Sequence, residues 1–280
     1  MNDAQNAAQI DYWNAAAGET WSQFHEQLDR QIEPLGLEAM RRLGPRLEER
    51  IVDIGCGCGQ TTVALAELVG PTGAVLGLDI SRPMLGVART RTVRDGACRP
   101  DFVEVDAQSG NLGRAAFDAA FSRFGVMFFS DPVAAFANIR SALKPSGRIA
   151  FVCWRPFQEN LWMRIPMEAA QPFLDPTPAM DPLAPGPFAF ADPDRVRSIL
   201  SSAGFDKATV DAFDAEIGGS SIEQTVALTF RVGPLGAALR ENPERIPAVA
   251  DAVRQAVAQY DSPAGVRMPA AVWIVHARAS

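Results

Sequence analysis

The chain has 280 residues, of which 48% are hydrophobic and 21% charged, which is typical of a globular protein and excludes a disordered or collagen-like chain. The formal net charge of −7 removes any general attraction for polyanions, so we do not expect nucleic acid as a partner. No apolar run approaches the roughly 18 residues that a membrane span needs. A small-molecule site suits these properties better.

The N-terminal stretch MNDAQNAAQID lacks the basic and apolar regions of a secretory signal, which favours a cytoplasmic location. Cys56 and Cys58 form a C-x-C pair, which does not match a zinc ribbon, and no second pair follows. We therefore predict no metal site and reduced thiols.

The chain begins with a helical pattern over residues 1–48, in which Thr20-Trp21-Ser22-Gln23 matches a capping box. From residue 51, short β-rich runs alternate with helical patterns. The strands are predicted at 51–54, 74–78, 101–105, 117–124 and 148–154. The helices between them are predicted at 61–69, from Ser81 towards Arg94, and from Asp131-Pro132 to a stop at Pro145-Ser146-Gly147.

After Trp154 this alternation ends. An amphipathic helix is predicted at 161–173, a proline-rich lid or loop at 175–187, a helix from Asp192-Pro193 to before Gly204, a strand at 209–217, mostly helix at 221–259 and a last strand at 271–277.

Strands separated by helices predict an α/β fold: a doubly wound, Rossmann-like sheet of seven mostly parallel strands with helices on both faces. We expect residues 1–48 to form an N-terminal helical cover. The core should span residues 49–280, with lid or insert segments near 157–191 and a late helical insertion near 219–262.

Ligands of such sheets bind beyond the carboxyl ends of the strands. There the sequence has its strongest motif, Val52-Asp53-Ile54-Gly55-Cys56-Gly57-Cys58-Gly59-Gln60. Its glycines permit a tight turn and close approach of a ligand, although they also satisfy steric needs alone. The dinucleotide fingerprint fails at Gln60. The acidic Asp53 beside the turn suits a ligand with a positive group, such as the amino group of S-adenosylmethionine.

Two further aspartates close the next strands. Asp79 follows the second strand and is placed to accept hydrogen bonds from both ribose hydroxyls, or to cap the helix that begins near Ser81. Asp106 follows the third strand and, with the amide of Ala107, could bind an adenine edge, or could be an ordinary turn residue.

Together these segments resemble class I S-adenosylmethionine-dependent methyltransferases. VDIGCGCGQTT is similar to the first motif of that family, LGLDIS to the second and FVEVDAQ to the third. FDAAFSRFGVMFF resembles the fourth-strand motif and LKPSGRIAFV the fifth-strand segment. The resemblance covers roughly residues 50–155 and points to the small-molecule branch that includes ubiquinone and menaquinone C-methyltransferases.

The resemblance implies S-adenosylmethionine as the cofactor. The residues implied to bind it are Trp13, Asp53, Gly55, Cys56, Gly57, Asp79, Ile80, Asp106, Ala107 and Ser122. Among them, the glycine turn would meet the methionine part, Asp79 the ribose, and Ile80 and Asp106 the adenine. Ser122 and Arg123 would lie beside the sulfonium and the acceptor.

Methyl transfer from a sulfonium mainly requires alignment of the donor and acceptor and exclusion of water. Arg123 is a catalytic candidate that could orient an acidic or carbonyl acceptor, or it could form a structural ion pair. His25 is a candidate base. Several aromatic residues either line an apolar acceptor pocket or pack in the core, namely Trp13, Trp21, Phe24, Phe128, Phe129 and Trp162.

The sequence therefore predicts methyl transfer to an aromatic, quinone-like or otherwise apolar small molecule, by a monomer or homodimer. An NAD(P)-dependent oxidoreductase is the alternative enzyme, disfavoured by Asp53, by Gln60 and by the lack of a Tyr-x-x-x-Lys pair. A non-catalytic protein that binds S-adenosylmethionine stays open. A macromolecular methyltransferase is disfavoured by the pI of 5.0 and by the lack of a D/N-P-P-Y/F motif.

Overall fold

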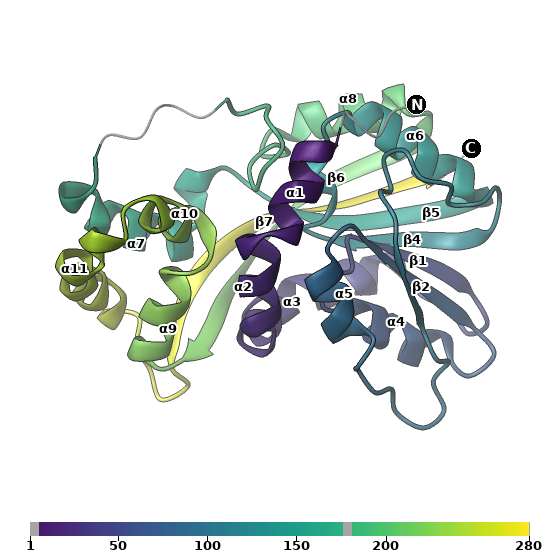
Figure 1. Ribbon diagram of the computed structural model, residues 1–280. Coiled ribbons are helices and arrows are strands. Elements are labelled where there is room, and N and C mark those ends of the chain that lie inside the picture. The colour runs from purple at the N-terminus through teal and green to yellow at the C-terminus, as the bar shows by residue number, and fades with distance from the viewer. Residues whose placement is uncertain (1–5, 176–180, 280) are drawn as a thin grey trace.

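The computed structural model describes residues 6–175 and 181–279, and its centre is a seven-stranded sheet (Figure 1). The strand order is β3-β2-β1-β4-β5-β7-β6. The strands are β1 Arg50–Ile54, β2 Ala74–Asp79, β3 Asp101–Glu104, β4 Phe117–Arg123, β5 Leu143–Trp154, β6 Phe205–Ser220 and β7 Val266–Ala279. All neighbours pair in parallel except β7, which is antiparallel to both β5 and β6. The predicted doubly wound, mostly parallel sheet is confirmed.

Helices cover both faces of this sheet, with α3 and α4 on one face and α6 and α8 on the other (Figure 1). The connecting helices are α4 Gln60–Val69, α5 Arg82–Ala88, α6 Pro132–Ala142 and α8 Pro193–Ser202. The N-terminal helices are α1 Ala7–Asn14, α2 Ala16–Gln23 and α3 His25–Leu43. The later helices are α7 Leu161–Ala170, α9 Ile222–Thr229, α10 Gly233–Glu241 and α11 Ile246–Ala258. Single 3-10 turns lie at η1 Val126–Phe128, η2 Phe157–Glu159, η3 Gln171–Phe173 and η4 Pro243–Arg245.

The central strands are apolar on both sides because helices cover both faces of the sheet. Ile51, Val52 and Ile54 of β1 are all buried, and so are Phe121 of β4 and Phe151 of β5. None of these strands shows the in–out alternation of a half-exposed sheet, so their order and ends, rather than a polar face, position the ligand site.

Both strands of the β6–β7 hairpin are longer than the sequence predicts. In Figure 1 its outer part leaves the main sheet and runs toward α7, α9, α10 and α11. A second apolar cluster forms there, where Val266 and Met268 of β7 pack with Val226, Leu239 and Val253 of the helices. The late helical insertion is therefore held by its own small core on this hairpin.

Three local predictions differ from the structure. Thr20 lies inside α2, and its carbonyl accepts the Phe24 N–H at 3.0 Å, so the predicted capping box is wrong. The helix expected to run toward Arg94 ends at Ala88. Capping patterns occur by chance within helices, and only the competing tertiary contacts select the real ends.

The third difference is the start of β5, which begins at Leu143 and includes the predicted stop at residues 145–147. Leu143 pairs with Phe117, and the register then shifts before Ala119 pairs with Arg148. The Pro-Ser-Gly stop therefore causes an irregularity in the strand rather than a separate turn. The 176–180 part of the predicted proline-rich lid lies outside the described residues. In residues 6–175 and 181–279 no helix is long and apolar enough to cross a membrane.

Candidate functional site

The carboxyl ends of β1 to β4 meet at one edge because these strands are parallel neighbours. Asp53 of β1 pairs with Gly77 of β2 on one side and with Phe121 of β4 on the other. The Cys56 N–H donates to the Leu78 carbonyl at 3.0 Å, which ties the glycine turn to the end of β2. The strand-end residues that the sequence singled out are thus brought to one edge of the sheet.

The turn after β1 needs its glycines. Gly55, Gly57 and Gly59 have φ angles of +65°, +55° and +81°, a region that residues with a Cβ rarely adopt. A Cβ on Gly55 would lie 2.7 Å from the Cα of Gly125, which follows β4. The sequence analysis missed Gly125, although its place directly after the strand end was a signal. Two backbones cross here at a distance that only glycine permits.

Asp53 is fully buried, and one of its carboxylate oxygens lacks a partner. The hydroxyls of Thr61 and Thr62 both donate to Oδ2 at 2.7 Å. Oδ1 has no hydrogen-bond partner in the described part of the chain. Burial raises the pKa of Asp53 to about 6, although the two threonine hydroxyls and nearby Arg123 act to lower it. An unpaired buried acceptor at a ligand-binding edge calls for a hydrogen-bond donor from outside the protein.

Asp79 ends β2 and turns its carboxylate toward the glycine turn. Oδ2 accepts the Gly57 N–H at 2.7 Å, and Oδ1 accepts the Ser81 N–H at 2.8 Å. Burial raises its pKa, while these backbone N–H groups act to lower it. Ser81 occupies the cap position of α5 without a side-chain cap bond. Because a carboxylate has about four lone-pair sites, Asp79 can still accept two further hydrogen bonds.

Asp106 orders the turn after β3. It accepts the Gln108 N–H at 2.9 Å, the Ser109 hydroxyl at 3.0 Å and the Asn6 side-chain amide at 3.2 Å. Ala107 is buried, and its carbonyl accepts from Asn138 at 2.9 Å. The turn interpretation of Asp106 is therefore realised in the structure, and binding of adenine by this turn stays a prediction.

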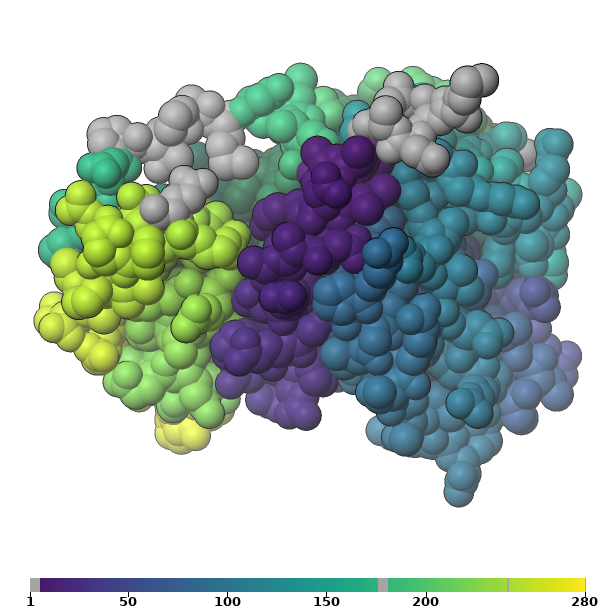
Figure 2. Space-filling view, viewed as in Figure 1, coloured from purple at the N-terminus to yellow at the C-terminus, as the bar shows by residue number. Residues whose placement is uncertain are grey.

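The N-terminal helices are fastened to the loop after β2. Asn14 donates to the Ile80 carbonyl at 2.8 Å and accepts the Arg82 N–H at 2.9 Å. The Ser81 hydroxyl donates to the Trp13 carbonyl at 2.7 Å. Figure 2 shows this N-terminal segment, in purple, lying between the blue residues of the glycine-turn half and the yellow-green late helices. Trp13 itself packs edge-on against Phe128 of η1.

Arg123 is held by protein groups rather than left free for a substrate. Its guanidinium donates to Gln60 and, at 3.1 Å, to Asp29 of α3. Asp29 also accepts from Arg91, which donates in turn to the Cys58 carbonyl of the glycine turn. This buried network favours the ion-pair interpretation of Arg123, whose contact with an acceptor stays a prediction. Asp29 was not singled out by the sequence, because no local motif marks it.

Ser122 is fully buried beside the glycine turn. Its hydroxyl donates to the Ile54 carbonyl at 2.7 Å and accepts the Gly125 N–H at 3.2 Å. It therefore joins the ends of β1 and β4, which is a structural role that the sequence did not predict. Direct contact of Ser122 with a cofactor stays a prediction.

The ring of His25 and the thiols of Cys56 and Cys58 differ in how readily they could take part in a reaction. His25 Nδ1 lies 2.7 Å from the Ser22 carbonyl, which can only accept, so in the neutral ring Nε2 keeps its lone pair. Burial raises the pKa of Cys58 to about 12 and that of Cys56 well above its usual range. Both thiols are therefore unsuited to act as thiolate nucleophiles.

Comparison with known proteins shows which protein family this chain resembles. Residues 51–147 match the family model described as a methyltransferase domain. The chain contains a methyltransferase domain. Aklanonic acid methyltransferase DauC of Streptomyces sp. (strain C5) is 33% identical over 138 residues, which cover 46% of this chain and 63% of that protein. The demethylmenaquinone methyltransferase of Lactococcus lactis is 30% identical over 115 residues, or 41% of this chain and 46% of that protein.

The match to these curated relatives thus spans about half to two thirds of their length. The whole fold is shared more widely. A candidate methyltransferase of Bacillus halodurans C-125 aligns over 87% of this chain and 98% of its own, with a TM-score of 0.57 and 17% identity. At that identity the likeness shows the Rossmann-like methyltransferase fold alone.

Proposed function

We propose that this protein transfers the methyl group of S-adenosylmethionine to a small-molecule acceptor. The observation that carries the proposal is Oδ1 of Asp53, which is buried beside the glycine turn of the matched domain and has no hydrogen-bond partner among the described residues. A cationic amino group satisfies such an oxygen, whereas the pyrophosphate of a dinucleotide would be repelled by the same carboxylate.

The other residues at the carboxyl edge of the sheet are suited to the ribose and adenine of S-adenosylmethionine. Asp79 keeps lone pairs for the two ribose hydroxyls, and Ile80 lies next to it for contact with the adenine. The turn of Asp106 and Ala107 follows the neighbouring strand and would bind the adenine edge. The enclosure of the cofactor would be completed by Trp13 of the helical cover and by Cys56 and Gly57 of the glycine turn. The positive φ of Gly57 suits close approach of the methionine part of the cofactor.

Bound S-adenosylmethionine would supply a methyl group activated by its sulfonium. The chain then has three tasks: to orient the acceptor, to exclude water and to take up a proton where the acceptor needs it. Helix α1, which is hydrogen-bonded to the loop after β2, would provide the cover together with α2. Arg123 would position the end of β4, and Nε2 of His25 would be available as a base.

The acceptor we propose is an apolar small molecule. Two relatives bear the names of aklanonic acid and demethylmenaquinone methyltransferases, which supports a small-molecule acceptor without naming the acceptor of this chain. We propose further that the protein acts in the cytoplasm, as a monomer or homodimer, and without nucleic acid.

The test is calorimetric titration of the wild type, Asp79→Ala and Asp95→Ala with S-adenosylmethionine and, separately, with NADH. Asp95 is an exposed turn residue and serves as the matched control. We expect S-adenosylmethionine to bind the wild type and the control alike, and Asp79→Ala to bind at least about tenfold more weakly, since it loses two charge-assisted hydrogen bonds.

Binding of NADH without S-adenosylmethionine would instead identify the oxidoreductase alternative. Binding of S-adenosylmethionine with no transfer of labelled methyl across a panel of neutral phenols, quinols and acids would favour the non-catalytic alternative.

A further inference from the structure

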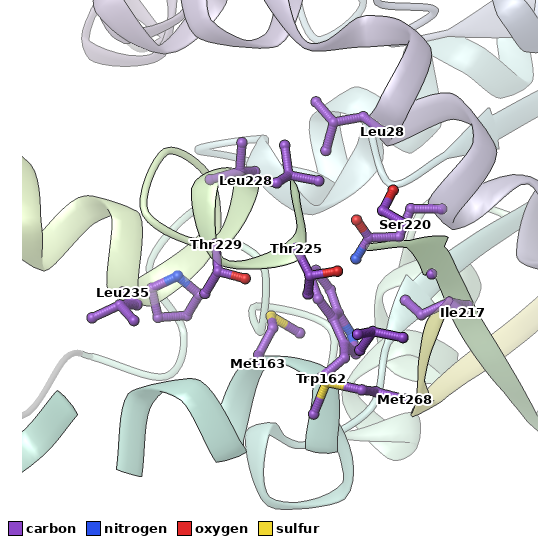
Figure 3. Close-up of a pocket in the computed structure, with 15 residues that line it drawn as sticks. Leu28, Trp162, Met163, Ile217, Ser220, Thr225, Leu228, Thr229, Leu235 and Met268 are labelled. Carbon is purple, nitrogen blue, oxygen red and sulfur yellow. The ribbon is translucent and has the colours of Figure 1, made fainter. Parts of the chain in front are cut away.

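Two features of the N-terminal cover could contact a ligand. Figure 3 shows the first, a cavity in which Leu28 of α3 lies across from Thr225 and Leu228 of α9. Its volume of about 40 Å³ has room for only a few water molecules, so it offers no space for a ring. The second feature is a pair of buried side-chain oxygens at α1, on Asn6 and Gln9, that have no hydrogen-bond partner among the described residues. Only these oxygens are free to select a group of a bound molecule.

Helix α1 connects the two loops that are proposed to hold the adenine of the cofactor. At its start, the side-chain amide of Asn6 donates to Oδ1 of Asp106, in the turn after β3, at 3.2 Å. At its end, the side-chain amide of Asn14 donates to the Ile80 carbonyl, in the loop after β2, at 2.8 Å. The two loops are neighbours at the carboxyl edge, because β2 and β3 pair in parallel. Helix α1 therefore spans from one adenine loop to the other.

Asn6 is buried, yet only part of its side chain is used. The residue is 4% exposed, and its Oδ1 has no partner within residues 6–175 and 181–279. Asn6 is also the N-cap residue of α1, where the oxygen of an asparagine ordinarily accepts a backbone N–H of the first helical turn. In the described part of the chain, Asn6 makes no such bond. Because an unpaired buried acceptor is costly, Oδ1 calls for a hydrogen-bond donor from a ligand.

The orientation of the Asn6 amide is fixed by the charge beside it. Its Nδ2 donates to the carboxylate of Asp106, which can only accept hydrogen bonds while it is ionised. If the amide turned over, Oδ1 would face that carboxylate with no hydrogen between the two oxygens. Asn6 therefore presents an acceptor, and not a donor, to a ligand that lies against the Asp106 turn.

The carboxylate of Asp106 offers a second acceptor at the same place. Its Oδ2 accepts the Ser109 hydroxyl at 3.0 Å and keeps a lone pair for another donor. Two acceptors side by side, one of them charged, match a group with two N–H donors and no acceptor. The 6-amino group of adenine is such a group.

We propose that Asn6 is a specificity-determining residue, whose Oδ1 accepts one N–H of the adenine 6-amino group while Asp106 accepts the other. This inference rests on the proposed function, because it takes the adenine of S-adenosylmethionine as the ligand. Asn6 lies outside residues 51–147, which match the methyltransferase domain, so the cover would share in selecting the base. A 6-oxo purine would place its own acceptor against two acceptors and would be rejected.

The test uses three probes that differ only at position 6 of the purine: S-adenosylhomocysteine, S-inosylhomocysteine with a 6-oxo group, and the analogue whose purine has no substituent there. Each is titrated by calorimetry into the full chain. We expect the wild type to bind S-adenosylhomocysteine at least about tenfold more tightly than either analogue, since both lose two hydrogen bonds. Equal binding of S-adenosylhomocysteine and the unsubstituted analogue would overturn the proposal.

Asn6→Leu removes the amide at similar size, and Asn111→Leu makes the same change at an exposed turn. We expect Asn6→Leu to lower the preference for S-adenosylhomocysteine over the unsubstituted analogue about threefold to tenfold, which is the loss of one hydrogen bond. Asn111→Leu should leave this preference as in the wild type. If Asn6 only fastened α1 to the turn, Asn6→Leu would weaken both ligands by the same factor, and an unchanged preference would overturn the proposal.

Gln9 lies about one helical turn after Asn6 and has the other unpaired oxygen, so Gln9→Leu is the second comparison. A lowered preference in Gln9→Leu but not in Asn6→Leu would show that Asn6 is the wrong residue. If Asn6→Leu fails to fold, hydrogen exchange of the wild type replaces it. With each ligand at saturation, we expect the amides of α1 to exchange more slowly with S-adenosylhomocysteine than with the unsubstituted analogue, and equal exchange would overturn the proposal.

The outcomes separate this inference from the proposed function. If S-adenosylhomocysteine does not bind the wild type, the proposed function fails and the assignment of Asn6 fails with it. If S-adenosylhomocysteine binds, and the preference for it is the same in the wild type and Asn6→Leu, only the assignment of Asn6 fails.

Discussion

Asp53→Asn removes a buried charge with little change in shape, and its effect on stability should depend on pH. The pKa of Asp53 is raised from 3.8 to about 6, a shift of about two units or about 3 kcal/mol. Because the folded protein holds this proton at a pH where the unfolded chain has lost it, stability falls as pH rises between these two values. About half of the loss is present near pH 5 and nearly all of it near pH 8.

Urea unfolding of the wild type and Asp53→Asn near pH 5 and near pH 8 measures this effect. The comparison across pH cancels any fixed gain or loss of hydrogen bonds to Thr61 and Thr62. We expect the free energy of unfolding of Asp53→Asn, relative to the wild type, to increase by about 1.5 kcal/mol between the two conditions. Asp95→Asn, which replaces an exposed charge, should show no such increase. If the difference in the free energy of unfolding stayed constant or changed in the opposite direction, the inference that burial raises the pKa of Asp53 would be refuted. The same variant should also lose affinity for S-adenosylmethionine near pH 8, since the counter-charge for the amino group is gone.

Two further changes test the contacts around the glycine turn. Asp29→Asn leaves the guanidinium groups of Arg91 and Arg123 without their anionic partner. We expect it to lower the free energy of unfolding, measured by urea titration, by about 3 kcal/mol. Asp95→Asn, measured in the same way, should cause almost no change. Gly18→Ala places a Cβ 2.0 Å from the Trp13 carbonyl; we expect a loss of about 1–3 kcal/mol and faster hydrogen exchange in α1, and unchanged exchange would contradict a fastened cover.

The sheet was predictable because its strands carry continuous apolar runs bounded by glycine, proline and aspartate. β1 illustrates this: its buried residues are Ile51, Val52 and Ile54, and the glycine turn follows at once. Helix and strand limits were less predictable. The Thr20 capping pattern falls inside α2, while the real capping box joins Ser221 and Gln224, because local patterns only compete with tertiary contacts.

The candidate cofactor residues were predictable for a similar reason. Asp53 and Asp79 lie at the carboxyl ends of β1 and β2, and Asp106 follows β3. Because these strands are parallel neighbours, the three acids share one edge of the sheet. Their partners were not predictable. Asn6 reaches Asp106 over 100 positions, and Arg123 reaches Asp29 over 94 positions, distances at which no local pattern applies.

The sequence by itself determined the sheet, the glycine turn and the acids at its edge, because strand and turn preferences act over a few neighbouring residues. Only the tertiary structure decided which polar side chains already have a partner within the protein and which do not. It pairs Arg123 with Asp29 and, within the described residues, leaves one oxygen of Asp53 without a hydrogen-bond partner. Burial and pairing are set by segments that lie far apart in the chain and meet only when the whole fold is formed.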